Sequence, residues 1–386
     1  MAYKKFKADR IFDGYRFLDE SVVLITKEDG TIEEIIIATE AGDDIQKLPG
    51  ILSPGLINCH CHLELSHLKG LIPEGTGLVT FLTQVMTQRA QSREVMMQAI
   101  EKAEDEMIAN GIVAVGDICN TPMTLVQKSK GRLWYHNFIE LAGAVPEVAE
   151  KRFKGGVELF SAFAQLYSIP IESISLVPHA PYSITDELLK KIVSFPGNHL
   201  LTIHNQESAA ENEWSRHKTG DFVEFYKTMG VDVSHFISTG KSSLQSYLQN
   251  FLKNQSLILT HNVETSEDDL AFAKASGIPL TWCLCPGANR FISGQLPAVD
   301  RFMKNECVTV LGTDSLASNH HLSILAELQM IRDAYPAIAI DQLLLWATSN
   351  GAKALQMDKL LGSFETGKRP GVILFDHELS KLSRLL

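Results

Sequence analysis

The chain opens with short β-rich runs, and its pattern changes near residue 51. Between residues 10 and 38 the runs SVVLIT and TIEEIIIA are separated by KEDG, a turn sequence flanked by charge. This predicts a small antiparallel sheet. From residue 51 onward, short apolar runs alternate with longer segments of helical periodicity, which is typical of βα units and a parallel sheet.

Eight apolar runs follow one another in this second region. Helical stretches lie between most of them, and Thr185 and Ser266 are the expected N-caps of two, TDELLKKIVSF and SEDDLAFAKASG. Eight strands with helical crossovers predict an α/β fold of the (β/α)8 TIM-barrel type. The runs are ILSPGLINCH, GIVAVGDI, LWYHNFIEL, SISLVPH, HLLTIH, SLILTH, IPLTWCLCP and CVTVLGTD.

The two ends of the chain resemble each other in pattern. After the eighth run, two helices are expected near 321–335 and 341–356, followed by a turn-rich segment and the apolar strand VILFD. Since both ends are β-like, we expect them to pair as one small, β-sandwich-like domain. The predicted boundaries are 1–53 and 360–386 for the small β domain and 54–359 for the catalytic barrel.

Composition narrows the class of protein and of partner. With 386 residues and 45% hydrophobic content, the chain can bury a large core. The 35 basic and 46 acidic side chains give a net charge of −11, which argues against nucleic acid or an anionic membrane as the main partner. No apolar signal-peptide core or membrane-length apolar run is present, and the six cysteines lie mostly in apolar runs. We therefore expect a cytoplasmic protein with reduced thiols; homo-oligomer formation is left open.

Histidines and an aspartate end five of the eight runs. In a barrel of this kind, chemistry takes place at the carboxyl ends of the strands. Each residue has a structural alternative: an HxH pair is a weak signal, a single histidine often has a structural role, and an aspartate can cap a turn. Convergence of all of them on one mouth of the barrel favours a metal site. The residues are His60, His62, His179, His204, His261 and Asp314.

Three imidazoles and one carboxylate suit Zn or Fe and leave a coordination position for water. The fourth run offers no lysine that could bridge a second metal, so a single ion is expected. Metal binding brings the pKa of water to about 7–9, yet its proton still has to be moved. Glu207, three residues after His204, is placed to do so. The alternative is a solvated helix residue comparable to Glu211 and Glu213.

The motifs PGLINCHCHLELS, HAPYS, HNQE, LTHNV, CPGANRFISG and GTDSLASN together resemble the amidohydrolase superfamily. The similarity is to its aminohydrolase branch, which includes cytosine, adenosine-type and S-adenosylhomocysteine-type deaminases and triazine chlorohydrolases. It extends from ADRIFDG to GKRPGVILFD, although the ending departs from the familiar GKRADLVLFD. The resemblance implies one catalytic divalent metal, Zn in preference to Fe, held by His60, His62, His204 and Asp314.

The resemblance also implies roles for the neighbouring residues. Glu207 is similar to the family's proton shuttle, His261 to the residue that orients water or polarises the reacting carbon, and His179 to a substrate-binding histidine. Asp314 would act both as ligand and as local base. Asn289 is a candidate substrate contact, but the residues before it depart from the family pattern. Glu64, in strand phase with His62, either faces the pocket or forms a salt bridge at the barrel rim.

The HLELS and GTDSLASN variants resemble enzymes of 6-aminopurine nucleoside-like compounds most, notably the aminodeoxyfutalosine deaminases. The implied reaction is hydrolytic loss of the exocyclic amine of an N-heterocycle, a small-molecule substrate. Deamination of a free base and dechlorination of a triazine are alternatives on the same metal site. A metal-free, non-enzymatic assembly protein is an alternative of another class, although none of the four ligands is missing.

The two-residue period of a β-strand determines which side chains of the LINCHCHLELS stretch can bind one metal ion together. Successive side chains of a strand point to opposite faces, so His60 and His62 share one face while Cys59 and Cys61 share the other. This excludes a four-ligand Cys/His knuckle unless the strand is broken. We expect the cysteines to pack outward against the helices as small apolar residues.

Overall fold

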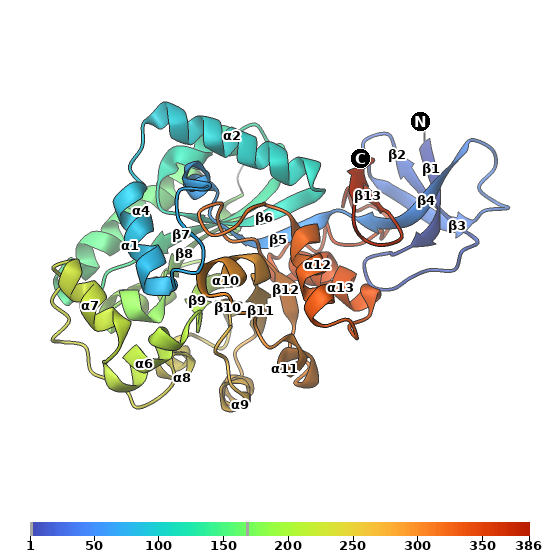
Figure 1. The fold of residues 1–386 in the computed structure, drawn as a ribbon. Coiled ribbons are helices and arrows are strands. Elements are labelled where there is room, and N and C mark those ends of the chain that lie inside the picture. The colour runs from blue at the N-terminus through green and yellow to red at the C-terminus, as the bar shows by residue number, and fades with distance from the viewer. Residues whose placement is uncertain (1–2, 167–169) are drawn as a thin grey trace.

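The computed structural model describes residues 3–166 and 170–386. The parts of the predicted domains at 1–2 and 167–169 lie outside the described residues. All eight predicted runs form strands, arranged in two parallel four-stranded sheets of order β5-β6-β7-β8 and β12-β11-β10-β9 (Figure 1). They are β5 (Leu56–Cys61), β6 (Ile112–Cys119), β7 (Trp134–Leu141), β8 (Ile174–Pro178), β9 (Leu200–Asn205), β10 (Ser256–His261), β11 (Leu280–Leu284) and β12 (Thr309–Leu311).

The two sheets meet at their carboxyl ends. The backbone N–H of His204 on β9 donates to the carbonyl of His179 after β8, at 2.9 Å. At the other seam, the N–H groups of Thr313 and Asp314 both donate to the carbonyl of His60, each at 3.0 Å. Among the described residues, a continuous ladder crosses neither seam. The fold is therefore TIM-barrel-like. The carboxyl ends of the strands, where hydrogen bonds join the two sheets, are the ends that carry the predicted site.

Helices surround the strands (Figure 1). Both predicted N-caps are confirmed: Thr185 accepts from the N–H of Leu188, and Ser266 forms a capping box with Asp269. The helices are α1 (Leu78–Gln88), α2 (Arg93–Ala109), α3 (Leu125–Lys128), α4 (Ala149–Ala164), α5 (Asp186–Val193), α6 (Ala209–His217), α7 (Asp221–Thr228), α8 (Ser243–Tyr247), α9 (Glu267–Ser276), α10 (Pro286–Ser293), α11 (Val299–Lys304), α12 (Ile324–Ala334), α13 (Ile340–Ala347) and α14 (Ser349–Ala354). Six short 3-10 turns are η1 (Leu63–Leu68), η2 (Pro122–Thr124), η3 (Pro146–Val148), η4 (Ile171–Ser173), η5 (Pro181–Ser183) and η6 (Leu248–Asn250).

The helix expected at 341–356 is divided into α13 and α14 at Thr348. This residue leaves the helical region, with φ −126° and ψ −94°, and its hydroxyl donates to the carbonyl of Leu344 at 2.6 Å. A threonine hydroxyl that bonds back to the preceding turn competes with the backbone ladder and bends the chain. The apolar periodicity continues across the bend, and for this reason it predicted one helix.

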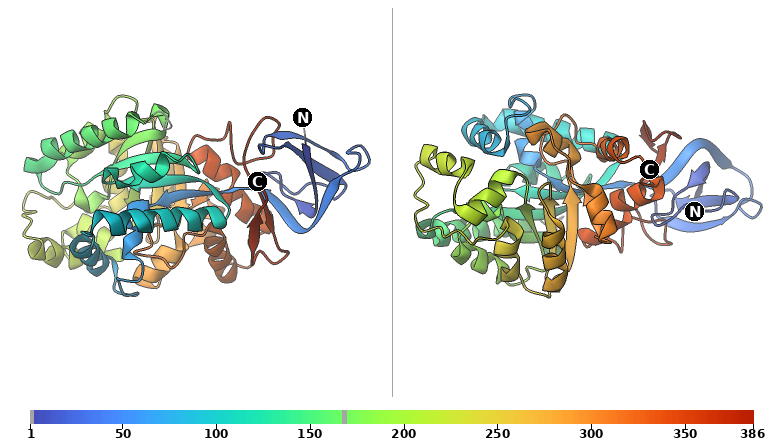
Figure 2. Two further views of the ribbon diagram at one scale, coloured as in Figure 1. Left: turned by 90° about the horizontal axis from the view of Figure 1, so that it is seen from above. Right: turned by 60° about the horizontal axis from the view of Figure 1, so that its bottom comes forward.

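The two ends of the chain pair as expected. One six-stranded sheet of order β14-β13-β4-β1-β2-β3 contains both ends, with β13 antiparallel to β4. It projects beyond the body of helices and parallel strands (Figure 2). Its strands are β1 (Tyr3–Ile11), β2 (Val22–Lys27), β3 (Ile32–Ile37), β4 (Ile45–Pro54), β13 (Val372–Phe375) and β14 (Leu382–Arg384). The sandwich-like form and the boundaries at 53/54 and 359/360 stay predictions.

Gly55 connects this sheet to the parallel strands, because β4 ends at Pro54 and β5 begins at Leu56. A Cβ atom at position 55 would lie 2.3 Å from Val113 Cγ1 and 2.8 Å from the carbonyl oxygen of Pro370. Only glycine allows the two segments to pack this closely. The strand that carries His60 and His62 is thereby anchored at its amino end.

The cysteines are buried or partly buried thiols, and all six are free. Cys59 and Cys61 are fully buried, and the Sγ of Cys59 lies 3.8 Å from the carbonyl of Gly351 on α14. The outward packing predicted for Cys59 is confirmed. Within 3–166 and 170–386, none of the helices combines the length and the apolar character that a membrane span requires.

Candidate metal centre

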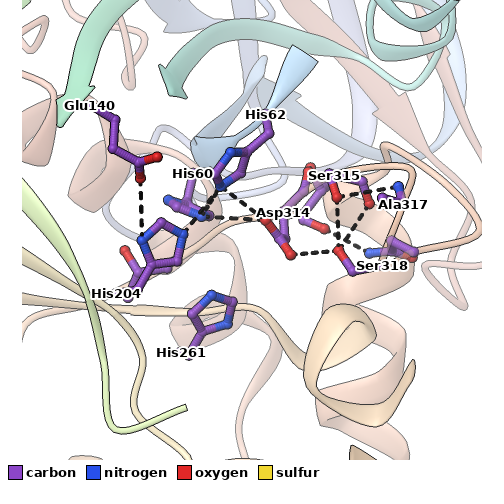
Figure 3. Close-up of polar contacts among 12 residues, drawn as sticks. His60, His62, Glu140, His204, His261, Asp314, Ser315, Ala317 and Ser318 are labelled. Carbon is purple, nitrogen blue, oxygen red and sulfur yellow. Dashed lines mark hydrogen bonds and ion pairs between the residues drawn. The ribbon is translucent and has the colours of Figure 1, made fainter. Parts of the chain in front are cut away.

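The four predicted ligands come together from three strand ends. His60 and His62 are on β5 and just after it, His204 is on β9, and Asp314 follows β12 (Figure 3). The Nε2 atom of His62 lies 3.2 Å from the Nε2 atoms of both His60 and His204. Asp314 Oδ1 lies 3.5 Å from His60 Nε2 and 3.3 Å from His62 Nε2. One ligand atom from each residue lies within 4.8 Å of all the others, and all four residues are buried.

The chemistry of these donors fits a divalent cation. His204 Nδ1 lies 2.8 Å from the carbonyl oxygen of His179. Since a carbonyl only accepts, Nδ1 carries the proton and Nε2 presents its lone pair to the centre of the cluster. Burial lowers the pKa of His62 and lowers that of His204 well below its usual value, which favours the neutral rings that bind metals. A shared cation would satisfy these facing nitrogens.

Asp314 supplies the negative charge of the cluster. Burial acts to raise its pKa, but the hydrogen bond with His60 and favourable electrostatic interactions with His62 and His261 outweigh burial and hold that pKa well below its usual value. Asp314 has a φ of 56°, a left-handed conformation that is uncommon for an aspartate. The strained backbone directs an ionised carboxylate toward the three imidazoles.

Glu207 lies in the turn between β9 and α6 and is only 5% exposed. Its Oε1 atom lies 3.7 Å from His261 Nε2. Burial, together with the charges of Asp314 and Glu211, raises the pKa of Glu207 well above its usual value. Glu207 is therefore buried beside the cluster and is not a solvated helix residue.

The expectation that Glu211 is a solvated helix residue is wrong. It is 1% exposed, whereas Glu213 on the same helix is exposed. Its carboxylate accepts from the backbone N–H groups of Gln206, at 2.9 Å, and Glu207, at 3.1 Å, and from the Ser243 hydroxyl, at 2.5 Å. Glu211 therefore holds the turn that carries Glu207.

His261 ends β10 with a φ of 78°. Its Nδ1 atom lies 3.0 Å from Asn289 Nδ2 on α10. Burial lowers the pKa of His261 to about 3, so the ring is neutral. Asn289, proposed from the sequence as a substrate contact, is buried against this ring, and its Oδ1 has no partner within the described part of the chain. Substrate contact by Asn289 stays a prediction.

His179 and Glu140 both lie beside His204. The Nδ1 atom of His179 lies 2.7 Å from the Ser183 hydroxyl, and its ring centroid is 4.7 Å from that of His204. Glu140, at the end of β7, has its Oε1 atom 3.5 Å from His204 Nδ1 and accepts from Asn120 through Oε2. Glu140 is not among the residues predicted from the sequence, although its position near the end of the third apolar run was an available signal.

Of the two alternatives for Glu64, its contacts fit a salt bridge at the barrel rim. Its Oε2 atom accepts from the N–H groups of Asn120 and Thr121 and from the Thr121 hydroxyl, at 2.8–3.1 Å. Its Oε1 atom is paired with Arg89 at 3.2 Å. Burial raises the pKa of Glu64 to about 7. Both oxygens are engaged with the protein, and a direct substrate contact stays a prediction.

The family model of the amidohydrolase family matches residues 51–385, which contain every residue of the cluster. The chain belongs to the amidohydrolase family. It is 28% identical over 330 residues to an adenosine deaminase of Helicobacter pylori, with coverage of 84% of this chain and 78% of the relative. It is 29% identical over 345 residues to a 5-methylthioadenosine/S-adenosylhomocysteine deaminase of Teredinibacter turnerae, with coverage of 85% and 72%.

A similar fold occurs in the crystal structure of Helicobacter pylori aminofutalosine deaminase in complex with methylthio-coformycin. The TM-score is 0.82 at 24% identity, and the match covers 97% of this chain and 92% of that chain. This structural similarity covers nearly all of the chain and supports the barrel-like arrangement of its strands. Its family makes this chain a hydrolase of carbon–nitrogen bonds. Its cluster of three histidines and one aspartate is a divalent-metal site.

Proposed function

We propose that this amidohydrolase is a zinc-dependent deaminase that removes the exocyclic amine of a 6-aminopurine nucleoside. The observation that carries the proposal is the position of Glu207 and His261, which face each other at 3.7 Å beside the cluster of metal-ligand atoms. A buried acid, a neutral histidine and a metal site in one place are the groups that hydrolysis of an amidine carbon requires.

The metal would be held by His60, His62, His204 and Asp314. We propose zinc in preference to iron because imidazole and carboxylate are both common zinc ligands, and a zinc site can expand from four to five ligands. A bound zinc ion would supply Lewis-acid activation of a water molecule. The chain's own residues then have to orient that water and move its proton.

Glu207 is proposed as the proton carrier. Burial raises its pKa well above the usual value, which makes the carboxylate a stronger proton acceptor than an exposed glutamate. It takes a proton from water and delivers it to the purine ring nitrogen next to the amine-bearing carbon. A second proton transfer to the amine lets it depart as ammonia, so that one water is consumed and one ammonia is released.

His261 is proposed to orient the water. The Asn289 amide group that contacts Nδ1 is a donor, so the His261 proton lies on Nε2, the atom that faces Glu207. His179, whose Nδ1 contacts Ser183, lies beside His204 and is proposed to bind the substrate. The contact between His261 and Glu207 supports the assignment of these two roles.

The relatives support the substrate class. The two curated relatives are named for adenosine, 5-methylthioadenosine and S-adenosylhomocysteine, which all contain a 6-aminopurine. Among such nucleosides, the HLELS and GTDSLASN motifs favour aminodeoxyfutalosine. We further propose that the partner is this small molecule and that the enzyme acts in the cytoplasm.

The test is ammonia release by zinc-loaded protein from matched compounds: adenosine, 5-methylthioadenosine, aminodeoxyfutalosine, free adenine and a chlorotriazine. We expect release from the nucleosides, with kcat/KM highest for aminodeoxyfutalosine. Turnover of adenine alone would contradict the nucleoside assignment, and chloride release from the triazine without ammonia release from any nucleoside would contradict the deaminase assignment.

A further inference from the structure

A chain of hydrogen bonds leads from the backbone to the metal-site aspartate. The N–H of Ala317 lies 3.2 Å from the Ser315 hydroxyl oxygen, and this oxygen lies 3.0 Å from that of Ser318. The Ser318 hydroxyl in turn contacts Oδ2 of Asp314 (Figure 3). All four residues are buried.

The donor-to-acceptor direction of these hydrogen bonds is fixed at both ends of the series. A backbone N–H can only donate, so Ser315 Oγ accepts from Ala317. An ionised carboxylate can only accept, so the Ser318 hydroxyl donates to Asp314. Ser318 has a single hydroxyl proton, and Ser315 must therefore donate its own proton to Ser318. The carbonyl oxygen of Ser315 is a more distant acceptor for Ser318, at 3.2 Å.

The two oxygens of Asp314 thereby have different partners. Oδ1 faces His60 and His62, at 3.5 and 3.3 Å, and Oδ2 faces Ser318. Rotation of the carboxylate out of this orientation would move the acceptor oxygen away from Ser318 and leave this donor without a partner in a buried position. Loss of a partner by a buried polar group is unfavourable, so the hydrogen bond selects one rotamer.

We propose that Ser318, oriented by Ser315, is a positioning residue that prepares Asp314 as a one-oxygen metal ligand. The hydroxyl pair holds Oδ2 away from the three imidazoles and aims Oδ1 at them. Linked hydroxyls polarise one another, so the second serine strengthens the first contact. The proposal rests on the metal site assigned above, and it holds for any substrate of the enzyme.

The experiment measures the zinc affinity of the full-length protein by competition with a fluorescent chelator. Removing an outer hydrogen-bond partner of a metal ligand typically weakens metal binding about 10- to 100-fold. We expect a loss of that size for Ser318→Ala and a smaller loss in the same direction for Ser315→Ala. The visible spectrum of the cobalt-loaded variants reports whether the ligand geometry has changed as well.

Ser175→Ala is the matched control. Ser175 is a buried serine on β8 whose hydroxyl contacts His136 at 3.0 Å, a histidine outside the ligand cluster. We expect its zinc affinity to equal that of the wild type. Unchanged affinity in Ser318→Ala, or an equal loss in Ser175→Ala, overturns the proposal. If Ser318→Ala does not fold, the zinc affinity of Ser315→Ala is the test, and an affinity equal to that of the wild type overturns the proposal. Because no readout uses a nucleoside, failure of the deaminase assignment would leave these results intact.

Discussion

The Nδ2 atom of Asn289 lies 3.0 Å from the Nδ1 atom of His261, and this contact determines which ring nitrogen of His261 carries the proton. An amide nitrogen only donates, so Nδ1 is the acceptor and Nε2 is protonated. The protonated nitrogen is the one that lies 3.7 Å from Glu207. The helix α10 therefore controls, through one side chain, the tautomer of a histidine at the end of β10.

Replacement of Asn289 tests this control. Asn289→Ala removes the donor, and since a hydrogen bond contributes about 0.5–1.5 kcal/mol, we expect kcat to fall about 2- to 10-fold. Asn289→Asp introduces an acceptor, which favours the opposite tautomer, and we expect a larger loss. Zinc content should not change in either variant. Wild-type kcat in Asn289→Asp would contradict the assigned tautomer.

Glu207→Gln removes the proton carrier but keeps the size of the side chain. We expect zinc to be retained and ammonia release to fall about 10²- to 10⁴-fold, the range typical of general acid–base catalysis. Steady-state kinetics and metal analysis of the same preparation measure both quantities. Glu213→Gln, an exposed position on α6, is the control and should behave as the wild type. Substantial activity in Glu207→Gln would assign the proton transfer to another group.

Glu211 makes the stability of the protein depend on pH. Burial raises its pKa from 4.5 to about 7. Between these values the folded state binds more protons than the unfolded state, so this contribution to stability is lost as the pH rises from 4.5 to about 7. One pKa unit corresponds to about 1.4 kcal/mol, and the change is at most about 3.5 kcal/mol.

The measurement is the free energy of unfolding of the wild type and of Glu211→Gln across this pH range. We expect the difference, wild type minus variant, to decrease with rising pH, because glutamine does not titrate. The exposed variant Glu213→Gln should give a difference that does not change with pH. A constant difference for Glu211→Gln would show that the carboxyl group keeps an ordinary pKa in the folded protein.

Removal of the metal should destabilise the folded protein as well as inactivate it. A ligand that binds only the folded state contributes RT ln(1 + [L]/Kd), about 2.7 kcal/mol at a free concentration 100 times Kd. We expect chelation to lower Tm and abolish turnover, and zinc to restore both. The variant His62→Ala should show little change in Tm on addition of zinc. A metal-free wild type with full activity would contradict the metal-dependent mechanism.

The sequence was most informative where a strand period or a strand end determined the position of a side chain. His60 and His62 share a face because β5 has a period of two, and His204 and Asp314 join them because parallel strands end at one edge. The four-residue cluster could be predicted in this way, with the family resemblance assigning the ligands.

Contacts between distant segments could not be predicted in this way. Glu211 has the helical spacing of a surface residue, but its hydroxyl partner, Ser243, lies 32 residues further along the chain. The bend at Thr348 arises from a side-chain hydrogen bond that the apolar pattern does not contain. Glu140 on β7 lies beside His204 on β9 because β8 pairs with β7 and its end is joined to β9 by the His204–His179 backbone hydrogen bond.

In the proposed reaction, the enzyme replaces the exocyclic amine of a 6-aminopurine nucleoside with oxygen from water. This is measured by turnover of adenosine or aminodeoxyfutalosine by zinc-loaded protein in ¹⁸O-labelled water, with mass spectrometry of the product and assay of ammonia. We expect a 6-oxopurine nucleoside with one oxygen atom from water and one ammonia per product molecule. Product formation without solvent oxygen, or no turnover of either nucleoside by protein that holds one zinc ion per chain, would contradict it.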